Sequence, residues 1–362
     1  MPHGKHKIRS SPRSLVHGAV STEVLHGMGS RSIGCMEVHS EDGMTFFFAG
    51  SGLFSSSRSG TVGLVAGHES DVGFVDGCRT EARFDHPCGM VLDPTFQCMY
   101  VSDTNNHALR RVMLTTGKVE TVVGGAEGVP GFVNGVGSDA RLNFPWGIAM
   151  DRHGVIFVAD QSNHCMRRVE LQGVHREAFI TTFVGGVRDG FRDGPGDQAL
   201  FSFPNGIAID HDGNLIVADY CNNRIRKVFL NSEARKVSTV GGNDSSGAYD
   251  DDDWCRDGPF ALSRFNGPKD VVVDCHNNIV VADAGNHTVR TIRRCGVVRT
   301  IAGSTELLAN GGDVEVPQDT MDGKGASVRF NGPCAMLFDH DGTLLVLDND
   351  NATCVRRVKY PT

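Results

Sequence analysis

The stretch VSDTNNHALRRV, residues 101–112, decides the fold because the chain writes it again four more times. The other copies are VADQSNHCMRRV at 158–169, VADYCNNRIRKV at 217–228, VADAGNHTVRTI at 281–292 and VLDNDNATCVRRV at 346–358. Their aspartates recur about every 60 residues, and short β-branched runs without a helical pattern fill the intervals. A repeat of this length and composition predicts a radial array of small β-sheets.

Each repeat contains the signal for four short strands. In the second copy these are the ranges 148–151, 155–159, 165–169 and 180–184, separated by turns that contain Gly, Asp, Asn or His. Short runs rich in Val, Ile, Phe and Thr between such turns predict a four-stranded antiparallel meander. We therefore interpret the repeat as one blade of a β-propeller.

The turn formula Asp-x-x-Asn-His-x-apolar-Arg resembles the NHL repeat. Three copies carry it in full and a fourth nearly so, namely Asp103/Asn106/His107/Arg110, Asp160/Asn163/His164/Arg167, Asp283/Asn286/His287/Arg290 and Asp219/Asn222/Asn223/Arg226. The resemblance covers nearly the whole chain. It implies an all-β fold, a β-propeller that in this family usually has six blades.

The physical chemistry of the formula favours architecture over catalysis. An aspartate that ends one strand can accept N–H groups of the turn it opens, and an arginine seven residues later returns across the hairpin as its ion-pair partner. In the last copy Ala352 replaces His and one extra residue precedes Arg356, so the ion pair is in question there. The residues assigned this structural role are Asp103, Arg110, Asp160, Arg167, Asp219, Arg226, Asp283, Arg290, Asp348 and Arg356.

The blade count depends on the two ends of the chain. The ranges 33–38, 44–49 and 61–66 align with first, second and fourth strands of a degenerate blade, although Gly50 stands where Asp is expected. The final copy has no fourth strand after it, and residues 20–25 resemble one. We predict that this segment completes the last blade, which gives six blades and avoids two unpaired strand edges.

The first 14 residues differ from the rest of the chain. They contain basic residues, Ser and Pro and no acidic residue, so we expect residues 1–14 to form a flexible basic tail and residues 15–362 to form the propeller. A mitochondrial targeting segment is the alternative interpretation. No stretch approaches the ~20 consecutive apolar residues of a membrane span. The eleven scattered cysteines indicate a reducing compartment, and we predict a cytoplasmic protein of undetermined oligomeric state.

The formal net charge of −8 disfavours nucleic acid as a partner, since phosphates require basic surfaces. The acidic segment 243–254 indicates instead a docking site for a protein partner, which a basic segment of that partner would occupy. A weak calcium site at the acidic loops or the channel mouth is the alternative, and otherwise no cofactor is expected. The candidate partner-binding residues are Tyr249, Asp250, Asp251, Asp252, Asp253 and Trp254, with Trp146 and Asn205 at the starts of first strands.

A second repeated phrase marks the linkers between blades. It reads Phe74-Val75-Asp76-Gly77, Phe132-Val133-Asn134-Gly135 and Phe191-Arg192-Asp193-Gly194. Because its phenylalanines recur at fixed offsets, we expect them to pack between blades rather than to bind a ligand.

An enzyme of this shape would place convergent ligands at the inner ends of several first strands. Only Lys269 and Asp270 are polar enough for acid–base chemistry at those positions, and Cys88 and Cys334 lie at equivalent ones. We therefore predict a non-catalytic protein-interaction scaffold with no catalytic residue. The alternative is a metal-dependent lyase or hydrolase with its site at the mouth of the central channel, where the metal ligands are unknown.

Overall fold

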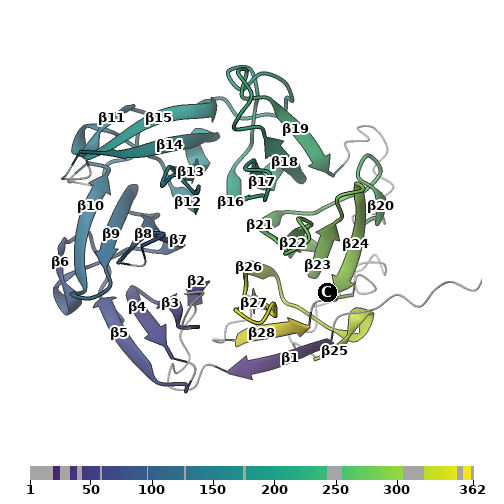
Figure 1. Ribbon diagram of the computed structural model, residues 1–362, viewed down its shortest axis with the longest axis horizontal. Coiled ribbons are helices and arrows are strands. Elements are labelled where there is room, and N and C mark those ends of the chain that lie inside the picture. Colours follow the sequence, from purple (N-terminus) through teal and green to yellow (C-terminus); the bar gives the residue numbers. More distant parts are fainter. Residues whose placement is uncertain are drawn as a thin grey trace, which may run out of the picture.

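The chain forms a disc of six β-sheets arranged around a central channel (Figure 1). The computed structural model describes residues 19–24, 33–38, 43–57, 59–95, 97–125, 128–173, 177–242, 255–304, 322–348 and 354–359. The predicted tail, residues 1–14, lies outside these ranges. Within them, no helix is long and apolar enough to cross a membrane.

The first three blades follow one another along the chain. Blade 1 contains β2 (Ile33–Val38), β3 (Thr45–Ala49), β4 (Gly52–Ser56) and β5 (Val62–Gly67). Blade 2 contains β6 (Gly77–Cys78), β7 (Pro87–Leu92), β8 (Cys98–Asp103), β9 (Ala108–Met113) and β10 (Lys118–Val123). Blade 3 contains β11 (Gly135–Val136), β12 (Pro145–Met150), β13 (Ile156–Asp160), β14 (Cys165–Gln172) and β15 (Glu177–Gly185).

The remaining blades complete the ring. Blade 4 contains β16 (Pro204–Ile209), β17 (Leu215–Asp219), β18 (Arg224–Val228) and β19 (Val237–Gly241). Blade 5 contains β20 (Gly258–Pro259), β21 (Pro268–Val273), β22 (Ile279–Asp283), β23 (Thr288–Ile292) and β24 (Val297–Ala302). Blade 6 contains β25 (Gly323–Lys324), β26 (Pro333–Phe338), β27 (Leu344–Asp348), β28 (Cys354–Lys359) and, from the N-terminal side, β1 (Ala19–Val24).

Single turns of 3-10 helix punctuate the strands. Three of them form the turns between second and third strands, η3 (Gln161–Asn163), η4 (Tyr220–Asn222) and η5 (Ala284–Asn286). The others lie in linkers, η1 (Arg79–Glu81), η2 (Gly137–Asp139) and η6 (Gly325–Ser327).

The ring closes as the sequence predicts. Strand β1 pairs antiparallel with β28, from Ala19 opposite Lys359 to Val24 opposite Cys354. The predicted six-bladed propeller with an N-terminal closing strand is therefore confirmed, with the strand one residue earlier than expected. The degenerate blade 1 is also present, and it includes a third strand, β4, that the sequence pattern did not reveal.

The core lies between blades rather than within them. Alternating side chains of each sheet meet those of the next, and each of the six junctions has its own apolar cluster. The junction of blades 6 and 1 joins Phe47 and Phe54 to Leu345 and Val355, so packing as well as pairing closes the ring. Each such side chain contributes about 1.5–3 kcal/mol when fully buried.

Four blades have a fifth strand where the sequence predicted four. The short strands β6, β11, β20 and β25 come from the linkers and pair with the outermost strand of their blade. Their two-residue length hides them from pattern analysis. They cover part of an edge that would otherwise be open to other chains.

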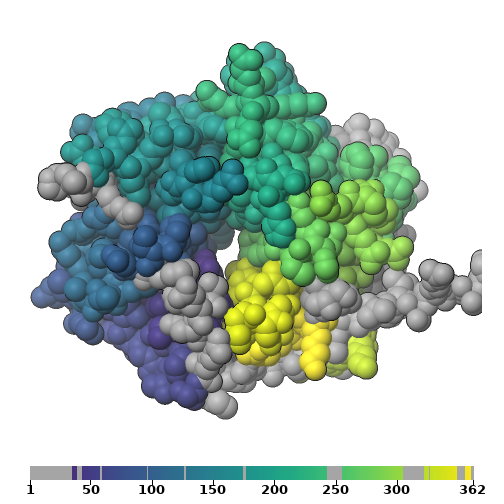
Figure 2. Space-filling model, viewed as in Figure 1, coloured from purple at the N-terminus to yellow at the C-terminus, as the bar shows by residue number. Residues whose placement is uncertain are grey.

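The disc has two different faces. One face, here the linker face, is built from the inter-blade linkers and the turns between second and third strands, which touch each other: the Asn106 side chain donates to the Gly73 carbonyl at 2.8 Å. The other, the hairpin face, is built from the turns between first and second strands and between third and fourth. The space-filling view shows the disc hollowed at its centre (Figure 2).

Candidate functional site

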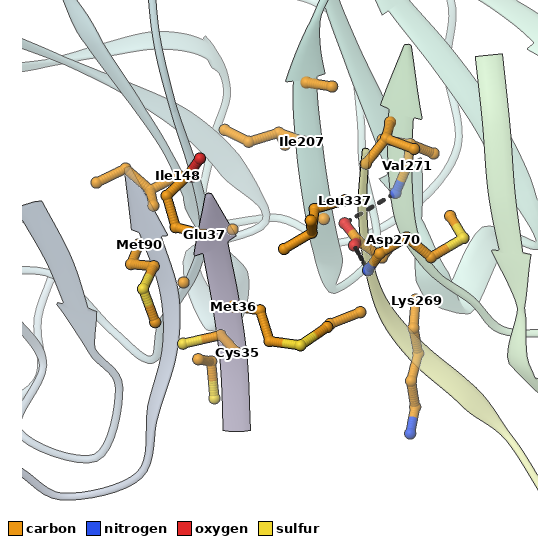
Figure 3. Close-up of a pocket in the computed structure, with 18 of the residues that line it drawn as sticks. Cys35, Met36, Glu37, Met90, Ile148, Ile207, Lys269, Asp270, Val271 and Leu337 are labelled. Atoms are coloured by element: carbon orange, nitrogen blue, oxygen red, sulfur yellow. Dashed lines mark hydrogen bonds between the residues drawn. The ribbon is translucent and has the colours of Figure 1, made fainter. Parts of the chain in front are cut away.

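The central channel is lined by the first strands of all six blades and encloses a cavity of about 590 Å³ (Figure 3). Its wall is chemically divided. Blades 3, 4 and 5 contribute aliphatic residues together with Lys269 and Asp270, whereas blades 6, 1 and 2 contribute sulfur. The sulfur-bearing residues, here the sulfur wall, are Cys35, Met36, Cys88, Met90, Cys334 and Met336.

Asp270 ties two blades together across the channel edge. Its Oδ2 accepts the N–H of Met336 at 2.7 Å and its Oδ1 accepts the N–H of Val271 at 2.8 Å. A Cβ at Gly206, on the preceding blade, would lie 2.6 Å from the Asp270 Cα, so only glycine leaves room there. Burial raises the pKa of Asp270 to about 7, and the two N–H donors oppose that rise. Both carboxyl oxygens are thus used in holding the wall.

Lys269 points the other way, as successive residues of a strand do (Figure 3). Burial raises the pKa of the Cys88 and Cys334 thiols to about 12, and the nearby Lys269 ammonium opposes the rise. In the described part of the chain that ammonium has no hydrogen-bond or ion-pair partner. It is a half-buried positive charge at the end of the channel where the first strands begin.

Glu37 lies on the sulfur-wall side, nearer the hairpin face. Its Oε1 accepts the N–H of Val38 at 3.3 Å, and no described Lys, Arg or His pairs with it. Burial in the channel raises the pKa of Glu37 to about 7. Sequence reasoning missed this residue because it belongs to the degenerate blade, where no motif marks the strand.

The cysteines of the sulfur wall are thiols engaged with backbone carbonyls. Cys35 donates to the Pro87 carbonyl at 3.6 Å, Cys88 to that of His86 at 3.3 Å and Cys334 to that of Leu347 at 3.5 Å. Among the described residues, no three His, Cys, Asp or Glu side chains are grouped so that they could hold a metal ion.

The two predicted contact residues at the first-strand starts behave differently. Trp146 is half-buried, and its ring meets the edge of the His86 ring at 6.0 Å between centroids. Asn205 is buried, and its Oδ1 accepts the Gln161 side chain of the preceding blade. Trp146 is therefore accessible at the channel mouth, whereas Asn205 already has a partner within the fold.

Two phenylalanines hold a costly backbone conformation beside the mouth. Phe144 and Phe203 have φ of 50° and 49°, and their N–H groups donate to Nδ1 of His107 and His164 at 3.0 and 3.2 Å. Glycine occupies the corresponding position before Pro268. A left-handed backbone costs a residue other than glycine about 1–2 kcal/mol. Both rings are nevertheless more than a third exposed on the linker face.

The repeated Asp and Arg residues lie away from the channel and form a closed network. Asp103 Oδ2 accepts Arg110 Nη1 at 2.6 Å and Asn106 Nδ2 at 2.9 Å, while Oδ1 accepts the N–H of Asp85 at 2.8 Å. That N–H belongs to the linker, so the aspartate holds the linker through a backbone N–H and the turn that it opens through the Asn106 side chain. The same ion pair recurs as Asp160–Arg167, Asp219–Arg226, Asp283–Arg290 and Asp348–Arg356, the last at 3.2 Å despite the extra residue.

Each buried arginine has a second polar partner that sequence reasoning missed. Arg110 Nη2 donates to Asp76 Oδ1 at 2.7 Å, and Asp76 also accepts the N–H of Thr121 on the fourth strand. The signal was present in the linker phrase, where an Asp or Asn precedes each Gly. The residues in this role are Asp76, Asn134, Asp193, Asp257 and Asp322.

The phenylalanines of the linker phrase stack on these arginines instead of only packing between blades. The Arg167 guanidinium lies 5.1 Å from the Phe132 ring centroid and that of Arg226 lies 4.9 Å from Phe191. Both phenylalanines are nevertheless more than a third exposed. The predicted docking residues Tyr249, Asp250, Asp251, Asp252, Asp253 and Trp254 lie outside the described residues.

Exposed apolar side chains gather in one kind of segment. In the described part of the chain, every exposed large apolar residue lies in a linker between blades, and none lies in a hairpin turn. These residues are Val72, Val75, Val129, Phe132, Val133, Phe144, Val187, Phe191, Phe203, Phe260 and Leu262.

Comparison with known proteins agrees with this geometry. The NHL repeat family model matches residues 142–168, 201–228 and 265–292, each running from a linker end through three strands. Protein SUPPRESSOR OF QUENCHING 1, chloroplastic, from Arabidopsis thaliana is 32% identical over 41% of this chain and 14% of its own length. NHL repeat-containing protein 2 from Homo sapiens is 28% identical over 51% of this chain and 25% of its own length. The alignments thus cover a minor part of each relative.

A solved structure shares the fold over nearly its whole length. A gluconolactonase from Xanthomonas campestris superposes with a TM-score of 0.59, covering 95% of both chains at 12% identity. That likeness concerns the fold alone. The family matches, the repeated turns and the closed ring of blades together show that the chain contains NHL repeats and folds as a six-bladed β-propeller.

Proposed function

We propose that this propeller is a non-catalytic platform for protein binding and that its linker face is the contact surface. The observation that carries the proposal is the confinement of exposed large apolar residues to the linkers. Scattered apolar residues are ordinary on protein surfaces, but their gathering along one kind of segment is typical of protein-interaction sites.

The strained phenylalanines support the same face. Phe144 and Phe203 keep aromatic rings at the surface in a conformation that glycine adopts without cost. Aromatic rings are enriched at the energetic centres of protein interfaces. Trp146 at the channel mouth extends this surface toward the disc centre.

The acidic segment 243–254 predicts that the partner is positively charged where it binds. The segment connects Gly242 to Cys255, which are the described residues on either side of it. Cys255 precedes the exposed Phe260 and Leu262 by a few residues. The segment's four consecutive aspartates would attract a basic segment of the partner and repel the phosphates of RNA.

Quantitative pull-down with purified variants tests the platform. Val187→Ser with Val72→Ser, both exposed on the linker face, should lower partner recovery, and so should Asp250–Asp253 changed to Ser, while the urea unfolding curve stays unchanged. His153→Ser, exposed on the hairpin face, is the control and should leave recovery intact. Equal recovery with all variants, or tight RNA binding at physiological salt, would refute the proposal.

A metal-dependent lyase or hydrolase is the second candidate, and Asp270 is the observation that favours it. A buried carboxyl with a raised pKa is common in active sites. Against it, both Asp270 oxygens already accept backbone N–H groups. Metal analysis of the purified protein, with lactone hydrolysis compared before and after chelation, decides between the two functions.

The cytoplasm is the proposed location, with residues 1–14 as a flexible tail. The described cysteines are all free thiols, which suits a reducing compartment. The name of the Arabidopsis relative supports an organelle as the alternative. A fluorescent fusion at the C-terminus, with and without residues 1–14, tests both.

A further inference from the structure

Two opposite charges face the same channel without partners. Lys269 and Glu37 both line the cavity, and neither has an ion-pair partner among the described residues. A charge that is partly removed from water and left unpaired raises the free energy of the folded state. A ligand that carries complementary charges would compensate both residues at once.

The two charges lie at different levels along the channel. Lys269 is the second residue of β21 and Glu37 is the fifth residue of β2, and the first strands of all blades run side by side. Three residues of strand rise separate these levels by about 10 Å. Figure 3 shows the Glu37 carboxyl and the Lys269 ammonium pointing to opposite ends of the pocket.

The wall between the charges is mainly apolar. Met36, Met90, Met336, Ile148 and Ile207 all line the cavity, and burial keeps the thiols of the sulfur wall protonated. Unbranched thioether side chains adapt to flexible apolar chains. The volume of about 590 Å³ lies within the range of ordinary small-molecule sites.

We propose that the central channel binds a slender molecule with a carboxylate at one end, an ammonium at the other and an apolar chain between them. The carboxylate pairs with Lys269 near the mouth, which His86 and Trp146 also line, and the ammonium pairs with Glu37. This inference is independent of the protein-binding role of the linker face.

Asp270 is not the proposed partner of the ligand's ammonium group. Its two oxygens accept the N–H groups of Met336 and Val271, so an ammonium would have to compete with the bonds that join blades 5 and 6. Glu37 accepts a single, longer bond at 3.3 Å, which leaves its other oxygen available to a ligand.

Isothermal titration with three probes tests the proposal. ω-Aminooctanoate carries both charges, octanoate carries the carboxylate alone and octylammonium carries the ammonium alone. We expect ω-aminooctanoate to bind at least about tenfold more tightly than either single-charge probe. Equal affinities for the three probes, or no measurable binding of ω-aminooctanoate, would overturn the assignment.

Single variants then assign each end. Lys269→Met should bring the affinity of ω-aminooctanoate down to that of octylammonium, and Glu37→Gln should bring it down to that of octanoate. Lys236→Met and Glu177→Gln, which change exposed residues outside the channel, are matched controls. Binding that survives both channel variants would refute the charge pairing.

The pH dependence of binding tests the role of Glu37, because a purely structural residue would not release a proton when the ligand binds. Because the free Glu37 has its pKa raised to about 7, pairing with an ammonium favours ionisation and releases a proton near neutral pH. The affinity for ω-aminooctanoate should therefore rise from pH 6 to pH 8 in the wild type and stay flatter in Glu37→Gln. An unchanged pH profile in the variant would exclude Glu37 as the ammonium partner.

Discussion

Buried charges occur in two regions of this propeller. In one region they form ion pairs, and in the other the described residues offer them none. In the outer repeat network, Arg226 is fully buried and pairs with Asp219 at 2.6 Å and Asp193 at 2.7 Å, besides two backbone carbonyls. In the channel, Lys269 and Glu37 have no ion-pair partner among the described residues. The difference teaches that burial alone does not mark a functional charge here. Completed partnerships indicate architecture, and missing partners indicate a binding site.

The loss of hydration on burial explains why substitutions in the two regions should differ in their effect on stability. Removing one member of a buried pair leaves the other charge without compensation and costs about 3–5 kcal/mol. Removing a charge that never had a partner should cost little folding free energy and can even stabilise the protein. Variants in the two regions should therefore separate stability from binding.

The largest expected effect follows from removing an aspartate of the network. Asp219→Ala deprives Arg226, Asn222 and the N–H of Ser202 of their acceptor, so we expect a loss of about 3–5 kcal/mol in the free energy of unfolding, measured by urea titration. Asp193→Ala, at the half-exposed outer end of the same arginine, should cost less. Asp212→Ala, exposed in a hairpin, should cost about 0.5 kcal/mol or less. A larger loss for Asp193→Ala than for Asp219→Ala would invert the assigned roles.

A smaller effect should come from the histidine that joins blades 3 and 4. His164 Nδ1 accepts the N–H of Phe203 at 3.2 Å, and in the next repeat Asn223 Oδ1 accepts that of Gly267 at 2.7 Å. His164→Asn should therefore keep the bond, whereas His164→Ala should lose about 1 kcal/mol. Thermal unfolding compares the two variants, and equal losses would show that the acceptor atom is not what stabilises the contact.

The same histidine predicts a direction of pH dependence. Burial lowers the pKa of His164 below 6.5, against a smaller opposing effect of Asp189, so the unfolded chain binds the proton more readily than the folded one. Stability from this site is complete above about pH 6.5 and is lost as the pH falls toward the folded-state pKa. His164→Asn should remove this part of the acid sensitivity, and its persistence in the variant would contradict the assignment.

The smallest effect on stability is expected in the channel. Because the folded-state pKa of Glu37 is raised from 4.5 to about 7, the folded protein binds the extra proton, and the contribution of Glu37 to stability falls as the pH rises between those values. Glu37→Gln should flatten that decline and slightly raise Tm at pH 8 in the absence of ligand. A marked fall in Tm at pH 8 would place Glu37 with the structural charges and weaken the comparison.

The sequence predicts the ring almost completely because its signals are periodic. Each Asp, Asn and Arg repeats at a fixed offset. Even the closing strand β1 is predictable, because its sequence resembles those of other fourth strands. Strand β4, Gly52–Ser56, escaped because a run of Gly and Ser without the turn formula reads as a loop. The second partner of each arginine was visible as the Asp or Asn before Gly, but its role depends on a linker folding back over the blade.

The channel was less predictable because nothing repeats in it. Lys269 and Asp270 were noticed as an adjacent polar pair, yet only the structure shows that one binds the wall and the other faces the cavity. Glu37 belongs to the blade with the weakest motif. A site formed by positions that differ from blade to blade is, by its nature, invisible to a search for what blades share.

The pairing of β1 with β28 also delays the closure of the ring during translation. The ribosome makes Ala19–Val24 before Cys354–Lys359, so the ring stays open until all the blades between these two strands have been translated. At ordinary elongation rates this delay is on the order of half a minute. Throughout that time β1 lacks its partner strand and its edges are exposed to other nascent chains. The closing step then joins the first and last blades into a single cooperative disc.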